Sequence, residues 1–263
     1  METLEILSAP TVFANGADNI TSRAISLGEI AAKDVRVAEV LKDFGLDYCC
    51  GGKKSLEEAC EELGLDLVKV KLKFHEVVLD KAVSRGFDFN RWELDFLADY
   101  IYNEHHKYYY DEGPVIAALM DKVVNHHGSS HPFLKNLAGL FSTLQTELST
   151  HFAEEETVIF PAIKILVIAK LQNIPLNTNE VLNITTSLKD MEADHEAAGS
   201  LLREMRSVTN DYTLPSDACN SFSLLYHKLI ALEEGLHQHI HLENNILFKK
   251  AALLQQELLN VTL

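Results

Sequence analysis

The chain has 263 residues, of which 47% are hydrophobic and 24% are charged, and its formal net charge is −16 at pH 7. This length and composition allow a sizeable hydrophobic core, in one large domain or in two smaller ones. The acidic balance excludes a sequence-independent hold on nucleic acid or on anionic membranes, because no basic surface is available to release counterions. We therefore expect neither nucleic acid nor membrane as a partner.

The start of the chain lacks the basic region and the apolar run of a signal peptide, and no later stretch reaches the roughly eighteen apolar residues of a membrane span. The chain has four cysteines, two of them adjacent, which do not make a disulfide framework. These features predict a cytoplasmic protein with reduced thiols.

Residues 1–25 contain turn formers without a sustained hydrophobic period, which predicts a mobile or loosely docked tail. Residues 26–83 predict a small domain of three short helices. A capping box at Ser26 opens the first helix, which we expect to continue to Gly45, and a second capping box at Ser55 opens the next one. A third amphipathic helix completes this domain.

Beyond a turn-rich linker at residues 84–90, residues 91–263 predict a helical bundle. Four long stretches have helical periodicity, turn formers separate them, and no β alternation is present. These stretches are residues 91–124, 133–171, 180–207 and 216–258. We therefore predict an all-α fold, in which a small helical domain precedes a four-helix bundle whose core can hold a metal site.

A duplicated motif indicates where that site lies. Glu155 follows His151 by four residues, as Glu243 follows His239, and this spacing puts each imidazole and its carboxylate on one face of a helix. Both pairs interrupt apolar stripes, the first of which we expect to continue to Val158. An unpartnered buried carboxylate or imidazole costs several kcal/mol, so a metal ion is the economical explanation.

Each copy of the motif also has a histidine at nearly the same distance upstream, His106 for the first copy and His195 for the second. The four helices would then bring four imidazoles and two carboxylates to one centre. Two metal ions could each take two histidines, with both glutamates bridging and room left for a solvent-derived bridge and an exogenous ligand. Iron suits this donor set, and zinc accepts the same donor types.

The loop after the first short helix contains Cys49 and Cys50, followed by two glycines. Lys53, Lys54 and the nearby helix start would favour thiolate over thiol at these cysteines. Such thiols could ligate iron, pass electrons or exchange disulfides. The alternative is that the pair acts as two small buried hydrophobic residues in a tight turn.

The motifs of both halves resemble one family. LDYCCGG at residues 46–52, followed by SLEEAC at residues 55–60, resembles the N-terminal domain of the di-iron iron-sulfur cluster repair proteins, also called repair of iron centres proteins. The histidine and glutamate motifs of the second half resemble the hemerythrin-like domain of the same family. The likeness extends from about residue 26 to the end, with both halves in the right order.

This resemblance implies a hemerythrin-like four-helix bundle with two non-haem iron ions (Fe2+/Fe3+) and an oxo or hydroxo bridge. It places the ligands on His106, in preference to the adjacent His105, and on His151, Glu155, His195, His239 and Glu243. The family's cysteine pair falls on Cys49 and Cys50. The resemblance further implies a cytoplasmic homodimer that acts on iron-sulfur proteins damaged by oxidative or nitrosative stress.

Three functions need the same ligands and an accessible site. The first is repair, in which loosely held iron is supplied to damaged clusters and the two cysteines aid reduction or transfer. The second is a carrier or sensor that binds dioxygen or nitric oxide without turnover. The third is a nitric oxide reductase, because two adjacent metal ions can assemble two nitrogen atoms.

Overall fold

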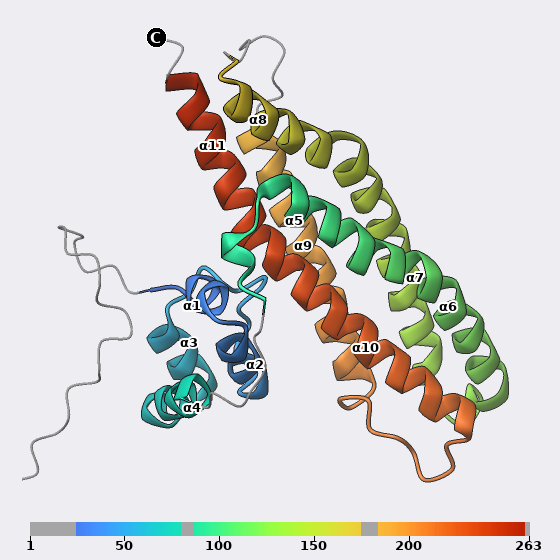
Figure 1. The fold of residues 1–263 in the computed structure, drawn as a ribbon. Helices are drawn as coiled ribbons and strands as arrows, with labels where there is room; N and C mark the ends of the chain where they lie inside the picture. The colour runs from blue at the N-terminus through green and yellow to red at the C-terminus, as the bar shows by residue number, and fades with distance from the viewer. Residues whose placement is uncertain (1–24, 80–86, 175–183, 261–263) are drawn as a thin grey trace, which may run out of the picture.

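The structure, a computed structural model, describes residues 25–79, 87–174 and 184–260. In this part of the chain all regular secondary structure is helical, and the only extended pairing is an isolated bridge between Ser26 and Ser55 (Figure 1). The predicted all-α fold is confirmed. The predicted tail up to residue 24 and the first three residues of the predicted linker, 84–86, lie outside the described residues. None of the described helices has both the length and the hydropathy of a membrane span.

The small domain contains four short helices instead of the three predicted. They are α1 (Leu27–Lys33), α2 (Val35–Asp43), α3 (Leu56–Leu63) and α4 (Leu67–Leu79). The capping boxes at Ser26 and Ser55 are both present, as predicted. The single helix expected from Ser26 to Gly45 is wrong, because Asp34 has an extended backbone with φ −155° and its side chain accepts from the Arg36 N–H. An aspartate that bonds to the backbone in this way ends one helix and caps the next.

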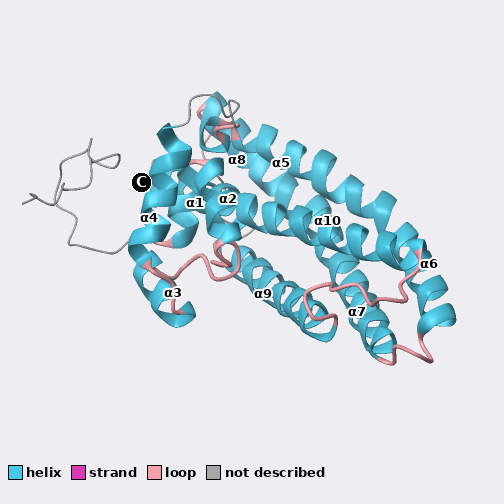
Figure 2. Cartoon of the chain, turned by 90° about the horizontal axis from the view of Figure 1, so that it is seen from below, coloured by secondary structure: helices cyan, strands magenta, loops and turns pink. Residues whose placement is uncertain are grey.

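Four long rods form the bundle (Figures 1 and 2). Three of them join two helices each, and the remaining rod is a single helix. The rods are α5 (Leu94–Ile101) with α6 (Lys107–His127), α7 (Phe133–Glu154) with α8 (Phe160–Gln172), α9 (Ile184–Val208), and α10 (Asn220–Leu242) with α11 (Phe248–Asn260). The four predicted helical stretches are thus confirmed to within a few residues at each described end.

A short π-helical segment interrupts each of the three composite rods. These segments are η2 (Tyr102–His106), η3 (Glu155–Ile159) and η4 (Glu243–Leu247). A π turn holds one residue more than an α turn, so it changes which residues of the following helix face the core. Val158, expected on the buried stripe, is therefore 37% exposed, and Ile159 is buried in its place.

Two hydrophobic clusters fill the bundle, and the π segments lie where they meet. One cluster includes Ile101 and Ile163 and joins α5, α8 and α11, while the other includes Ile116 and Leu144 and joins the helices of the opposite half. Each fully buried aliphatic side chain of this size contributes roughly 1.5–3 kcal/mol. The packing on both sides therefore holds the π segments in a fixed position.

The small domain docks on α10 and η4. The amide of Asn245 donates to the carbonyl of Tyr48 at 3.0 Å, and the Tyr48 ring meets the His241 ring edge-on at 5.2 Å. Two ion pairs also join the small domain to the bundle, Lys42 with Glu234 of α10 at 2.6 Å and Lys53 with Glu192 of α9 at 2.5 Å. This contact brings the cysteine loop against the middle of the bundle.

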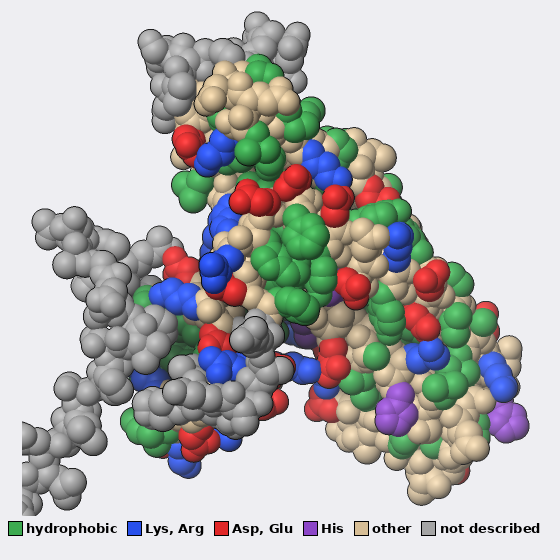
Figure 3. Space-filling view, in the orientation of Figure 1, with side chains coloured by type: hydrophobic (Ala, Val, Ile, Leu, Met, Phe, Trp, Pro, Cys, Tyr) green, Lys and Arg blue, Asp and Glu red, His purple; other side chains and the backbone are tan. Residues whose placement is uncertain are grey.

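A short 3-10 helix, η1 (Phe89–Arg91), gives a second connection between the two parts. The Asn90 side chain donates to the carbonyl of Ala32 in α1, and the Asn90 carbonyl accepts from Lys250 in α11. The surface around the start of α5 is apolar (Figure 3), and Phe96 is 58% exposed there.

Candidate metal centre

The six side chains predicted as metal ligands meet in the middle of the bundle. His106 ends η2, Glu155 and Glu243 begin η3 and η4, and the remaining three histidines lie in helices. All six are between 0% and 4% exposed: His106, His151, Glu155, His195, His239 and Glu243. The structure thus brings together every predicted ligand, from all four rods.

Glu155 lies among three of the histidines. Its Oε1 is 3.1 Å from His151 Nε2 and 3.9 Å from His195 Nε2, while its Oε2 is 3.3 Å from His106 Nε2. The two oxygens of one carboxylate therefore face different imidazoles. A bridging carboxylate needs this arrangement.

Glu243 completes the cluster from the other side. Its Oε2 is 3.0 Å from His239 Nε2 and 3.2 Å from His195 Nε2. The Nε2 atoms of His195 and His151 are 2.9 Å apart. Both His-x3-Glu pairs thus place their side chains on one face, as the helical spacing predicts.

The polar atoms of this cluster are close together but poorly aligned for hydrogen bonds. Within the described part of the chain, neither oxygen of Glu155 or Glu243 has a hydrogen-bond partner, and neither has the Nε2 of His106 or His239. Their lone pairs therefore face a shared space instead of one another's hydrogens. Buried carboxylates in this state are costly unless a cation neutralises them, so the donor set fits a metal ion.

Burial disfavours the charged form of each of these carboxylates and imidazoles. Nearby groups of opposite charge decide which of them are charged. Burial and Glu243 raise the pKa of Glu155, but His151 and His106 outweigh them and hold it below its usual value. Burial lowers the pKa of His151, but Glu155 and Glu243 outweigh it and raise that pKa to about 9. Burial keeps the pKa of His239 well below its usual value. A metal ion would displace the proton of His151 on binding.

Hydrogen bonds from outside the cluster orient three of the imidazoles. Each joins a histidine Nδ1 to a neighbouring oxygen: His106 to Glu156 at 2.9 Å, His195 to Asn244 at 2.9 Å, and His151 to Asp194 at 3.4 Å. Such partners fix the tautomer and leave Nε2 facing the centre. Asp194 and Asn244 were not predicted, although each is adjacent in sequence to a predicted ligand.

The neighbouring histidines lie outside the set that converges. His105 is next to His106, and its ring meets the His239 ring at 5.9 Å. Burial lowers the pKa of His105 to about 4, which keeps it neutral at pH 7. His241 faces the small domain, where its Nδ1 pairs with the amide of Asn245. His105 and His241 therefore lie outside the set of close contacts that joins Glu155 and Glu243 to the four predicted histidine ligands.

The cysteine loop lies directly behind His195. The Cys50 thiol donates to the His195 carbonyl at 3.4 Å, and its sulfur is 3.8 Å from that of Cys49. Gly199, one turn further along α9, makes this contact possible, because a Cβ there would lie 2.8 Å from the Cys50 sulfur. The two predicted functional cysteines are thus next to the candidate metal centre, and both are free thiols.

The expectation of a thiolate is wrong for Cys49. Its hydrogen bond with Cys50, its burial and the negative charge of Asp47 raise the pKa of Cys49 well above the usual value. The two lysines expected to lower it bind carboxylates instead, Lys53 to Glu192 and Lys54 to Glu62. Cys49 is therefore a protonated thiol at neutral pH.

A helical bundle with a buried cluster of histidines and glutamates defines a hemerythrin-like metal-binding domain. Residues 97–251 match the family described as the hemerythrin HHE cation binding domain, and the chain belongs to it. Residues 24–77 match a domain of unknown function (DUF542). The family match and the cluster together point to iron as the bound metal.

The curated relatives cover both parts of the chain. The chain is 30% identical over 232 residues to the iron-sulfur cluster repair protein ScdA of Staphylococcus haemolyticus, across 88% of this chain and 99% of the relative. It is 31% identical over 232 residues to the iron-sulfur cluster repair protein YtfE of Edwardsiella ictaluri, across 88% and 98%. A probable iron-sulfur cluster repair protein of Haemophilus influenzae is 30% identical over 224 residues, across 85% and 95%. The chain belongs to this family, which confirms the resemblance.

Proposed function

We propose that this chain is a di-iron protein that repairs iron-sulfur clusters damaged by oxidative or nitrosative stress, and that it does so by supplying iron. The convergence of six buried ligating side chains, whose polar atoms lack aligned partners, carries the proposal. The names of the relatives support the repair role. Damaged iron-sulfur proteins are then the partners, and a cytoplasmic homodimer is the proposed form.

The arrangement of donors supports two ions. His151 and His195 face each other on one side of Glu155, and His106 approaches the other oxygen of the same carboxylate. We assign the second pair to His106 and His239, with Glu155 and Glu243 bridging. Iron bound by these ligands supplies an exchangeable, redox-active cation with room for a small exogenous ligand such as nitric oxide or dioxygen.

The protein's own groups hold and release this cargo. Glu156, Asp194 and Asn244 orient the imidazoles, and the two buried carboxylates neutralise the positive charge. Imidazoles and carboxylates accept several first-row metal ions, whereas thiolates are the usual ligands of iron-sulfur clusters, so a damaged cluster site offers iron its usual donors. We assign to Cys49 and Cys50 a role in reduction or transfer, because the Cys50 thiol touches the backbone of His195.

The test is reactivation of an enzyme whose cluster has been oxidised or nitrosylated. Iron-loaded protein should restore its activity, and metal-free protein should not. Cys49→Ala with Cys50→Ala should slow the reactivation while the iron stays bound, whereas Cys60→Ala, a thiol buried in the small domain, should leave it unchanged. Equal reactivation by metal-free protein would refute iron supply.

Three further measurements address the centre itself. Iron quantitation with Mössbauer spectroscopy should give two coupled iron ions per chain, and a single uncoupled ion would contradict the di-iron assignment. Nitrous oxide formed over many turnovers without reactivation would identify a nitric oxide reductase instead. A reversible spectral change with nitric oxide or dioxygen, again without reactivation, would identify a carrier or sensor.

A further inference from the structure

A second group of metal-binding side chains lies at the far end of the bundle. His127 is the last residue of α6, so about 30 Å of helix separates it from His106 at a rise of about 1.5 Å per residue. His131 follows in the turn to α7, and Asp217 and Cys219 precede α10. We propose that these four residues form a zinc site that is distinct from the central iron site.

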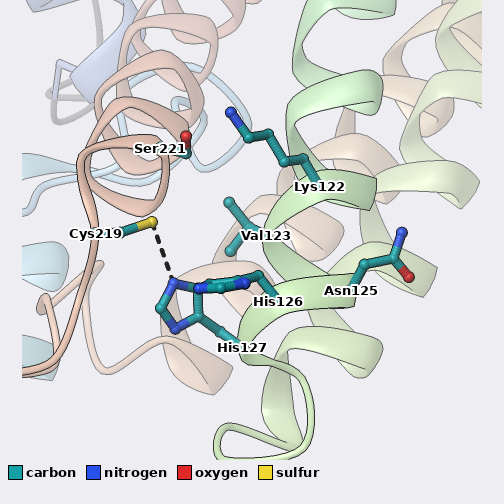
Figure 4. Close-up of a pocket in the computed structure, with 7 residues that line it drawn as sticks. All are labelled: Lys122, Val123, Asn125, His126, His127, Cys219 and Ser221. Atoms are coloured by element: carbon teal, nitrogen blue, oxygen red, sulfur yellow. Dashed lines mark hydrogen bonds between the residues drawn. The ribbon is translucent and has the colours of Figure 1, made fainter.

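The spacing of the donors supports this site. His127, His131 and Asp217 each offer a ligand atom, and these atoms lie within 4.8 Å of one another. His131 Nε2 is 3.0 and 3.2 Å from the two Asp217 oxygens. The Cys219 sulfur is 3.1 Å from His127 Nε2, and the two side chains point toward each other (Figure 4). Ligands of a tetrahedral zinc ion with bonds of about 2.1 Å lie about 3.4 Å apart. His127, His131 and Asp217 therefore form the core of the proposed site, and the Cys219 sulfur, which lies outside this group of three, would become the fourth donor by turning from His127 toward the ion.

The burial of His127 is a second, independent argument for the zinc site. His127 is 8% exposed, and its Nε2 has a thiol as hydrogen-bond partner. A thiol is a weak donor and a weak acceptor, so it compensates poorly for removing an imidazole from water. The Cys219 side chain also makes no capping bond at the start of α10, although it occupies the N-cap position. A metal ion would satisfy both groups.

The surroundings allow an ion to enter. Beside His127 and Cys219 is a cavity of about 470 Å³, lined by side chains of the last turns of α6 and the first turn of α10, including His126 and Ser221 (Figure 4). Asp217 is exposed, with 59% of its side chain accessible. Two imidazoles, a carboxylate and a thiol form a mixed nitrogen, oxygen and sulfur set that suits zinc. The ion would tie α6 to the segment that precedes α10.

Zinc binding to iron-loaded, full-length protein tests the site. Wild type should retain one zinc ion per chain after gel filtration, with its iron content unchanged. Asp217→Asn changes an exposed side chain and leaves the core intact. It should weaken zinc binding by more than about tenfold, because loss of a partner that only orients a ligand already costs about that much. His126→Ala is the matched control, because His126 adjoins the cavity but is not among the donors, and it should bind zinc as wild type does. Equal zinc affinity in wild type and Asp217→Asn would refute the site.

Cobalt tests the sulfur ligand. Co2+ in place of zinc should show a thiolate charge-transfer band that Cys219→Ser abolishes. Because Asp47, Cys49 and Cys50 form another group of possible donors, Cys50→Ser serves as the control and should keep the band. A band that survives in Cys219→Ser and disappears in Cys50→Ser would overturn the assignment.

Discussion

One carboxylate oxygen orients a ligand of the candidate iron centre. Oε1 of Glu156 pairs with His106 Nδ1 at 2.9 Å and accepts from the Tyr110 hydroxyl at 2.8 Å. The pairing with His106 Nδ1 directs Nε2 of the same ring toward Glu155. Glu154, two residues earlier on the same helical rod, is exposed and offers a matched comparison.

We therefore expect Glu156→Ala to weaken iron binding about 10- to 100-fold, because a histidine ligand that loses its outer partner also loses its fixed orientation. Glu154→Ala should leave iron binding unchanged. Iron retained during dialysis against a graded series of chelator concentrations measures both. Equal retention by the two variants would show that Glu156 does not position His106.

The two adjacent cysteines should differ in reactivity. Cys49 is 6% exposed and its pKa is raised, first by the hydrogen bond with Cys50 and then by burial. The thiolate is the reactive form, and a raised pKa moves its appearance to higher pH. Iodoacetamide should therefore label Cys49 more slowly than Cys50 at neutral pH, and labelling of Cys49 should rise only in strongly alkaline solution. Mass spectrometry across a pH series locates the label, and prior labelling of Cys49 at pH 7 would contradict this expectation.

At the scale of helices, the π segment η3 sets the direction of Glu155. The widened turn begins at Glu155 and ends at Ile159, and both of these side chains are fully buried. Thr157, which lies between them, is exposed. Removal of one residue from a π turn leaves an α turn and preserves the register of the helix that follows. Deletion of Thr157 should therefore retain the helical fold and redirect the carboxylate.

The expected result is a circular dichroism spectrum like that of wild type together with a loss of bound iron. Substitution of Thr157 by Ala is the control, since it keeps the length of the turn and should retain the iron. If the deletion variant binds iron normally, the π segment is not needed to place the ligand. An unfolded deletion variant would show instead that η3 is required for the fold.

Hydrophobic period and His-x3-Glu spacing predicted the rods and the two His–Glu pairs, because both depend on local helical geometry. The choice of His106 over His105 needed the family resemblance. The π segments left no comparable signal. Val158 fits an unbroken α period as well as Ile159 does, and only packing against the other rods selects Ile159. The raised pKa of Cys49 was missed because it depends on the hydrogen bond with Cys50 and on burial, which the sequence pattern does not show. Lys53, which the sequence places beside the thiols, binds the distant Glu192 instead.

At the scale of the whole molecule, η4 belongs to both parts of the protein. Asn244 bonds to Nδ1 of His195 at the metal cluster, and Asn245 donates to the carbonyl of Tyr48 in the small domain. The side-chain amides of two successive asparagines thus have separate roles: one orients a ligand of the candidate metal centre, and the other holds the small domain in place. The cysteine loop reaches His195 through this contact.

These two asparagines allow docking and metal binding to be separated. Asn245→Ala should loosen the small domain, because the Tyr48 carbonyl loses its donor, and should speed both alkylation of Cys50 and hydrogen exchange at residues 46–52. Its iron binding should stay as in wild type, since no cluster residue loses a partner. Asn244→Ala should do the opposite: it should weaken iron binding about tenfold, while Cys50 is alkylated at the same rate as in wild type. If Asn245→Ala also loses iron, the small domain contributes to holding the metal, and the two roles of η4 are not independent.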